Sequence, residues 1–243
     1  MKELIKVSAI EIKFFLREKV AVFFTFLFPL FILFLFGSIW GKNPKYFGYL
    51  IPMLIAMVGF SNALYGLGLT LSYYRESGIF KRIGITPLKA HTYIYGLILV
   101  RVLIILIQSF FLLALGIVLY GLKIEGNFWI LLLSILIGIL SMLSIGGVVA
   151  TISKNHETAL AISNFTLTPV LFLSGAFIPL FLFPKALQHI AKVSPVYYFI
   201  KILQDIIIFG KGLKDEWISF SVLIFCLIFC FLITAKTFKL KEQ

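Results

Sequence analysis

Residues whose types could support chemistry are few in this sequence, and their spacing assembles no familiar catalytic or metal-binding set. The three histidines, His91, His156 and His189, fall in three different predicted loops. Cys226 and Cys230 lie one helical turn apart within an apolar run, where two small buried side chains are a better interpretation than a disulfide or a metal site. The sequence therefore predicts no metal site and no catalytic residues in this chain.

Nucleotide-binding and hydrolase motifs are also absent from the sequence. There is no GxxxxGK[ST] loop, so we expect no P-loop, and there is no HExxH or GxSxG pattern. Arg101 is the one cation placed well inside an apolar run. Charges within a membrane span are candidates for a functional role, but an arginine near the inner end of a span can also reach back to the interface. Both roles stay open for Arg101.

The composition indicates an integral membrane protein. Of the 243 residues, 61% are hydrophobic and only 13% are charged, with a mean hydropathy of +1.07. A soluble domain is nearer half apolar and a quarter charged. The net charge of +12 comes from basic residues between apolar runs, which favours topogenic and lipid-headgroup contacts over nucleic acid binding.

The apolar runs predict an all-α membrane fold with six transmembrane helices, each long enough to cross the hydrocarbon layer. The expected spans are Val20–Trp40, Leu50–Ser72, Thr92–Tyr120, Phe128–Ser153, Ala159–Phe183 and Trp217–Ala235. The distribution of Lys and Arg favours both termini in the cytoplasm. We expect a single transmembrane domain over residues 1–243, in which spans one to five occupy 20–183 and the last span with its tail occupies 217–243.

Two further segments are predicted to be helical without crossing the membrane. The spacing of apolar and basic residues over 1–19 predicts an interfacial amphipathic helix. Its expected apolar face comprises Leu4, Ile5, Ser8, Ile12, Phe15 and Leu16, and its basic stripe comprises Lys2, Lys6, Lys13 and Arg17. Residues 184–216 contain two short helices, Lys185–Val193 and Val196–Phe209, separated by Ser194-Pro195. Their apolar content predicts a re-entrant pair that dips into the outer leaflet.

The cytoplasmic segment after the second span is short, basic and amphipathic. It predicts a helix over Glu76–Ile83 that is stopped by Gly84 and by Thr86-Pro87. Its apolar side, formed by Ile79, Phe80 and Ile83, needs a protein partner or lipid.

At this segment the chain resembles the membrane subunit of type-2 ABC transporters. The resemblance rests on Arg75, Glu76, Gly78, Lys81, Arg82, Thr86, Pro87 and Leu88, with Tyr74 standing where many members have another acid. A second resemblance, to the family's outer re-entrant region, rests on Ser174, Gly175, Pro179, Pro184, Pro195 and Tyr198.

The resemblance implies a transport subunit that is not itself an enzyme. It implies two copies of this chain working with two separate P-loop ATPase subunits, which would bind ATP and Mg²⁺, so that no cofactor belongs to this chain. In the family the coupling segment docks on the ATPase. Here Glu76, Lys81 and Arg82 would make charge contacts, while Phe80 and Ile83 would fill a groove. The expected location is the plasma membrane, among membrane lipids, with the substrate path lined mainly by spans one, two and five.

The substrate is less well defined by the sequence. A Phe-rich interior with few charges favours export of a hydrophobic or amphipathic compound such as a drug, an antibiotic or a lipid. Export of a lipid-linked polysaccharide or teichoic acid is the alternative within the family. A membrane-embedded lipid-modifying enzyme is an alternative of another class, but it needs convergent acids, His or Ser at membrane depth, and the sequence offers no convincing set. A structural scaffold would not need the coupling segment.

Overall fold

The fold consists of long helices with short connections, which follows from the apolar runs and their breakers. The computed structural model describes residues 2–40, 43–85, 88, 90–175 and 183–237, and no strand occurs among them. The elements are α1 (Lys2–Arg17), α2 (Lys19–Val22), the π-helical η1 (Phe23–Leu27), α3 (Phe28–Trp40), α4 (Pro44–Ser61), the π-helical η2 (Asn62–Leu69), α5 (Thr70–Glu76), α6 (Ile79–Ile83), α7 (Ala90–Tyr120), α8 (Phe128–Ile152), α9 (His156–Leu173), α10 (Lys185–Ala191), α11 (Pro195–Phe209) and α12 (Trp217–Thr237).

Five helical stretches of the described chain are long and apolar enough to cross a membrane. They are Lys19–Trp40, Pro44–Glu76, His91–Tyr120, Phe128–Ile152 and Trp217–Thr237. The first is built from α2, η1 and α3, and the second from α4, η2 and α5. These stretches confirm an all-α membrane protein, and each matches one predicted span.

The remaining predicted span, Ala159–Phe183, corresponds to α9. This helix is 18 residues long and carries Ser163, Asn164, Thr166 and Thr168 among its apolar residues, so it is less apolar than the other five. Residues 176–182, which the prediction included, lie outside the described residues. The number of six spans therefore stays a prediction.

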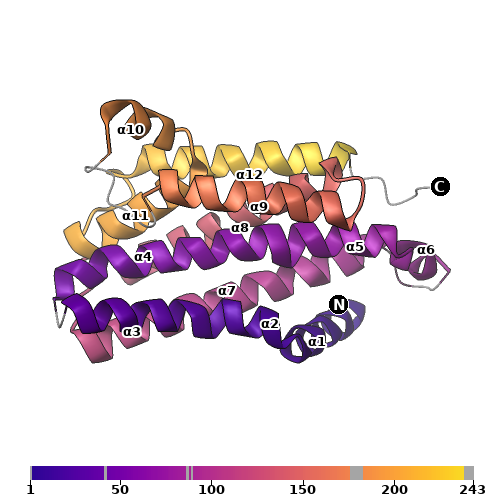
Figure 1. The fold of residues 1–243 in the computed structure, drawn as a ribbon, viewed down its shortest axis with the longest axis horizontal. Coiled ribbons are helices and arrows are strands. Elements are labelled where there is room, and N and C mark those ends of the chain that lie inside the picture. Colours follow the sequence, from indigo (N-terminus) through magenta and orange to yellow (C-terminus); the bar gives the residue numbers. More distant parts are fainter. Residues whose placement is uncertain (1, 41–42, 86–87, 89, 176–182, 238–243) are drawn as a thin grey trace.

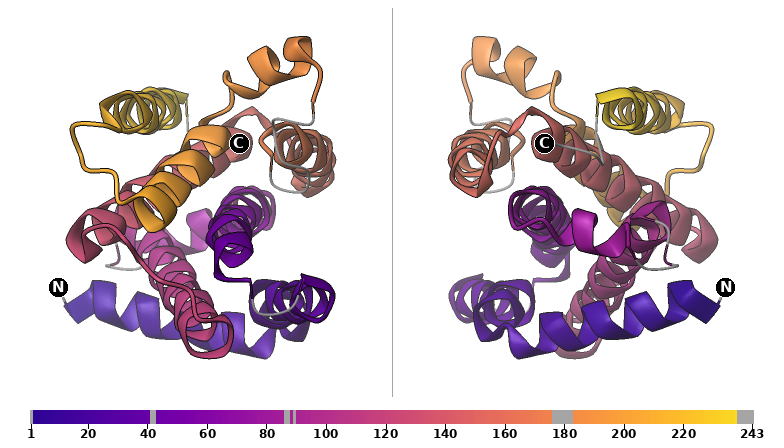
Figure 2. Two further views of the ribbon diagram at one scale, coloured as in Figure 1. Left: turned by 90° about the vertical axis from the view of Figure 1, so that its left-hand side faces the viewer. Right: turned by 90° about the vertical axis from the view of Figure 1, so that its right-hand side faces the viewer.

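The helices run side by side, and α1 and α6 lie toward one end of the bundle (Figure 1). We call this the α6 end, since α1, α6 and the last turn of α12 lie there, and the opposite one the α10 end. Helix α1 lies crosswise beneath the long helices and packs on α7, as Figure 2 shows. A crosswise helix at one end of a bundle has the geometry expected of an interfacial helix.

The predicted apolar face of α1 is divided between the bundle and the surface. Val7 and Glu11 are buried together with Ser8 and Phe15, whereas Ile5 and Leu16 are exposed. Only part of the predicted apolar face therefore packs on the protein. The physical reason is that an interfacial helix has two partners, the bundle and the lipid, so its apolar residues do not all face the protein core.

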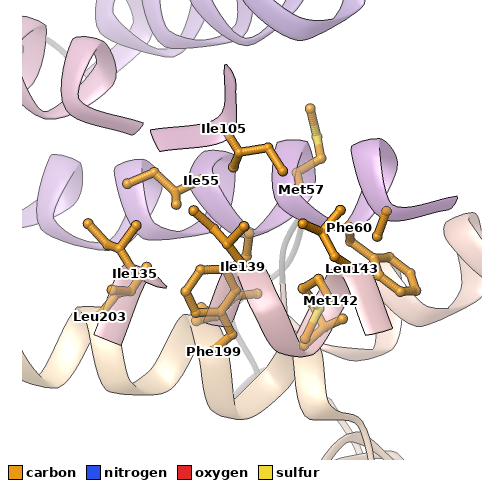
Figure 3. Packing of buried hydrophobic residues seen from close by; sticks show 14 of the residues in the cluster. Ile55, Met57, Phe60, Ile105, Ile135, Ile139, Met142, Leu143, Phe199 and Leu203 are labelled. Carbon is orange, nitrogen blue, oxygen red and sulfur yellow. The ribbon is translucent and has the colours of Figure 1, made fainter. Parts of the chain in front are cut away.

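Helix α8 is the centre of the core and contacts α4, η2, α11 and α12. Figure 3 shows its buried side chains interlocked with those of α4, α7 and α11. Phe199 of α11 is fully buried, and its ring lies where a side chain at Gly138 would stand. The second predicted re-entrant helix is therefore packed inside the bundle at the α10 end, while α10 lies outside it against α9.

Small residues let η2 and α8 cross at very short range. A Cβ added to Gly146 would stand 1.9 Å from the backbone oxygen of Ala63. Backbone cannot move aside as a flexible side chain can, so this contact fixes how closely the two helices pack. Close approach through small residues is a common source of helix association in membranes.

We therefore expect Gly146→Ala to destabilise the fold by about 1–3 kcal/mol through forced separation of η2 and α8. Gly59→Ala is the matched control, because a Cβ at Gly59 meets its nearest atom at 3.6 Å, an ordinary contact. In a helix that change is expected to be neutral or stabilising by up to ~1 kcal/mol. Thermal unfolding of both variants in one detergent checks this, and equal unfolding temperatures would contradict the role given to the crossing.

Candidate functional site

The predicted coupling segment forms a helix-turn-helix at the α6 end. Helix α5 ends at Glu76, Ser77 and Gly78 make the turn, and α6 begins at Ile79. Gly78 has φ +70°, a left-handed conformation that favours glycine, and no atom lies within 4 Å of its missing Cβ. The requirement for glycine here is conformational and not steric. Thr86 and Pro87 lie outside the described residues.

Arg75 and Glu76 bind the neighbouring helices of their own chain. The guanidinium of Arg75 donates from Nη2 to the backbone oxygen of Ser153, the residue that ends α8. Glu76 Oε2 accepts the backbone N–H of His156, the first residue of α9, at 2.7 Å. A cation on a helix carboxyl end and an anion on a helix amino end both complement the helix dipole. We call these two contacts the α8–α9 clamp.

The apolar side of α6 also faces inward, which corrects an expectation. Phe80 and Ile83 are buried in the main hydrophobic core of this chain, so they fix α6 to the bundle and offer no free surface to an ATPase groove. Lys81 and Arg82 are exposed, and Leu88 is partly buried against the core. The predicted segment is thus divided into an inward apolar side and an outward basic side.

A cavity of about 370 Å³ opens beside this segment, between α1, the first two spans, α7 and the start of α9. Its polar lining includes Glu11, Glu18, Tyr65, Tyr73, Tyr74 and Arg101. Both π-helical segments contribute to the wall, through Phe24 and Thr25 of η1 and through Asn62 of η2. π-Helical turns are rare and often occur at functional sites. Sequence periodicity gave no sign of them.

Glu11 is the buried acid of this cavity, with an exposed fraction of 3%. Its Oε1 accepts the hydroxyl of Tyr74 at 3.2 Å and also the hydroxyl of Tyr93. Arg101 lies nearby, with 9% of its surface exposed and its guanidinium carbon 5.7 Å from the centre of the Phe15 ring. Arg101 is therefore buried at the cavity wall, beside the crosswise helix α1.

The second predicted group of site residues lies at the α10 end. Ser174, just after α9, donates from Oγ to Ser194 Oγ at 2.9 Å, and Gly175 has φ +83°. Pro184 precedes α10, Pro195 is the first residue of α11, and Tyr198 is partly buried next to Tyr197. The structure brings Ser174 and the start of α11 together. Pro179 lies outside the described residues.

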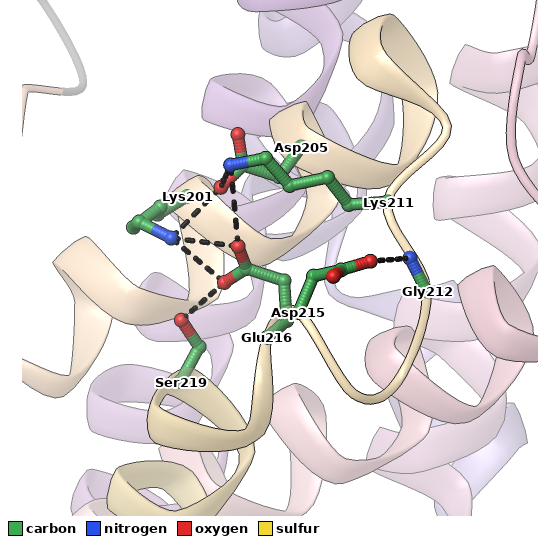
Figure 4. Close-up of polar contacts among 7 residues, drawn as sticks. All are labelled: Lys201, Asp205, Lys211, Gly212, Asp215, Glu216 and Ser219. Carbon is green, nitrogen blue, oxygen red and sulfur yellow. Dashed lines mark hydrogen bonds and ion pairs between the residues drawn. The ribbon is translucent and has the colours of Figure 1, made fainter.

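A cluster of four charged side chains ties α11 to α12 at this end (Figure 4). Lys201 Nζ lies 2.8 Å from Asp205 and 2.7 Å from Glu216, and Lys211 Nζ lies 3.1 Å from Asp205. Burial alone lowers the pKa of Lys201, but its hydrogen bonds to the two acids raise this pKa above its ordinary value. Burial alone raises the pKa of Asp205, yet its hydrogen bonds within the cluster lower it. These directions keep Lys201 and Asp205 charged at neutral pH.

Several of these contacts were not anticipated from the sequence. Glu11, Ser153, His156 and Tyr93 gave no signal because their partners are 63 or more residues away in the chain. Lys201 and Asp205 carried a weak signal, since oppositely charged residues four apart share one helix face.

Comparison with known proteins agrees with this architecture. The family described as ABC-2 type transporter matches residues 3–208. ABC transporter G family member 20 of Dictyostelium discoideum is 24% identical over 83% of this chain and 28% of its own length. The multidrug ABC permease YbhR of Escherichia coli is 23% identical over 74% of this chain and 49% of its length, and the transport permease YvfS of Bacillus subtilis is 24% identical over essentially both chains. The chain thus spans about a quarter of the length of the Dictyostelium relative and about half the length of the Escherichia coli relative. Because the family model covers most of its residues, the chain belongs to the ABC-2 type transporter family of membrane proteins.

Proposed function

We propose that this chain is the permease subunit of an ATP-driven exporter, working as two copies with two separate P-loop ATPase subunits. The observation that carries the proposal is the combination at the α6 end: α6 has an exposed basic side, and the end of α5, which directly precedes it, is joined by the α8–α9 clamp to two other helices. Such an element can receive a force from outside and pass it on. In this proposal the α6 end is cytoplasmic, the membrane is the plasma membrane, and ATP and Mg²⁺ bind to the partner.

The proposed docking contact uses the outward side of α6. Lys81 and Arg82 are exposed on this short helix, so they can pair with acidic residues of an ATPase. Glu76 has a different task from the one that the sequence predicted, since its carboxylate already accepts a hydrogen bond from α9. The proposal therefore assigns docking to Lys81 and Arg82 and transmission to Arg75 and Glu76.

The proposed cargo is a hydrophobic or amphipathic compound. Support comes from the cavity at the α6 end, where aromatic residues such as Phe14 and Phe24 stand beside a few polar groups. The Escherichia coli relative is described as a multidrug permease, which agrees with a cargo of this class.

Docking is tested by purifying the tagged full-length chain from its native membranes and identifying what accompanies it. We expect a P-loop ATPase in a one-to-one ratio with the wild type, and a loss of about tenfold or more in bound ATPase for the double variant Lys81→Glu/Arg82→Glu, because attraction becomes repulsion. The control Lys192→Glu/Lys214→Glu makes the same charge change at exposed positions of the α10 end and should retain the ATPase. A wild-type chain that purifies alone would contradict the proposal.

Transmission is tested separately with Glu76→Ala in membranes that hold the complete transporter. We expect normal co-purification of the ATPase but several-fold more ATP hydrolysed per molecule exported, because α9 loses its hydrogen bond to the end of α5. Glu157→Ala is the matched control, since Glu157 is an exposed acid in the first turn of α9, the helix that Glu76 contacts. Equal coupling ratios in the two variants would remove the α8–α9 clamp from the mechanism.

A further inference from the structure

Arg101 is a buried cation with an incomplete set of partners. Only 9% of its surface is exposed, and within the described chain its Nε has no hydrogen-bond partner. A desolvated guanidinium that lacks acceptors is costly, and a bound acceptor reverses this cost. The side chain lies at the wall of the 370 Å³ cavity, and the exposed part of its surface can donate to a molecule that enters there.

The surroundings hold the guanidinium in place without satisfying it. Its carbon is 5.7 Å from the centre of the Phe15 ring on one side. On another side, a Cβ at Gly66 would stand 3.2 Å from Cζ, Nε and Nη1, so the glycine leaves just enough room for the group. Glu11 lies close enough to interact electrostatically, but its Oε1 already accepts two tyrosine hydroxyls. Arg101 is therefore positioned in advance for a further ligand.

The mouth of the cavity carries the opposite charge. Glu18 lines the cavity, is exposed, and forms no cap hydrogen bond at the start of α2. It stands between the end of α1 and the start of α2. The cavity wall thus holds both a buried cation and an exposed acid. Apolar side chains, including Phe14, Phe24 and Leu69, complete the wall.

We propose that this cavity binds a zwitterionic amphiphile, whose phosphate or carboxylate group accepts hydrogen bonds from Arg101 while its ammonium group lies near Glu18 and its apolar chain lies along the phenylalanines. The arginine fork suits a planar or tetrahedral anion. The crosswise helix α1 forms one wall, and in this proposal α1 lies at the membrane surface, so that the site is at the level of lipid head groups. Binding is a property of a single chain and does not depend on the proposed docking of an ATPase.

The test measures binding by the isolated full-length chain in detergent, from the rise in unfolding temperature during titration. Three probes are compared: a lysophosphatidylethanolamine, a lysophosphatidylglycerol with the same acyl chain, and inorganic phosphate. We expect the wild type to bind the zwitterionic lipid most tightly, the anionic lipid more weakly, and phosphate without detectable effect. Arg101→Met should weaken both lipids by about tenfold or more, the loss of one charge-assisted contact.

Variants that leave Arg101 in place keep the test decisive if Arg101→Met does not fold. Glu18→Gln is expected to remove the preference for the zwitterionic lipid while retaining binding. Gly66→Ala, which crowds the guanidinium, should weaken both lipids. Glu3→Gln changes an exposed acid of α1 away from the cavity and is the control, expected to match the wild type. Unchanged lipid binding in Arg101→Met or in Gly66→Ala, an unchanged preference in Glu18→Gln, or stabilisation by phosphate equal to that by lipid would overturn the proposal.

Discussion

A polar or charged group inside this bundle is costly unless it is paired, because hydrocarbon offers no water to solvate it. Much of the structure's detail follows from this cost. Glu11 is paired with two tyrosine hydroxyls, and the buried acids of the α11–α12 cluster are paired with two lysines. Arg75 and Glu76 are paired with the ends of two helices. Each pairing joins elements that hydrophobic packing alone would leave free to slide.

The same cost explains which features the sequence revealed. A long apolar run identifies a membrane span because no other environment suits it, and each of five such runs matches a helical stretch in the structure, the second of them longer at both ends than predicted. Helix α11 was also predictable, since Ser194-Pro195 starts it and an apolar stretch follows. The starts of α4, α8 and α9 are also set by neighbouring residues. The side chains of Asn43, Asn127 and Asn155 each accept a hydrogen bond from the backbone of the first turn of the helix that follows.

Features that depend on distant pairing were not predictable in this way. The basic α6 reads as a docking helix, but nothing local shows that Phe80 faces the chain's own core while Lys81 faces outward. Tyr74 looked like a departure from the family pattern, yet its hydroxyl binds a glutamate 63 residues earlier. The side of α1 that packs on the bundle was not predictable for a related reason, since an apolar residue on such a helix suits lipid as well as protein. One-dimensional patterns cannot choose between two apolar surroundings.

The second span shows how these constraints combine into a mechanical element. It is continuous from Pro44 to Glu76, so α6 is attached to a single helical rod that reaches the α10 end. At its α6 end the rod is joined to α8 and α9 by Arg75 and Glu76, and in its middle the backbone of Ala63 touches the place where Gly146 has no side chain. In the proposed function, a force on α6 would therefore act on α8 and α9 as well as on the rod. Because the cavity wall includes both the rod's π-helical segment and the start of α9, any such movement must also change the shape of the space around Arg101.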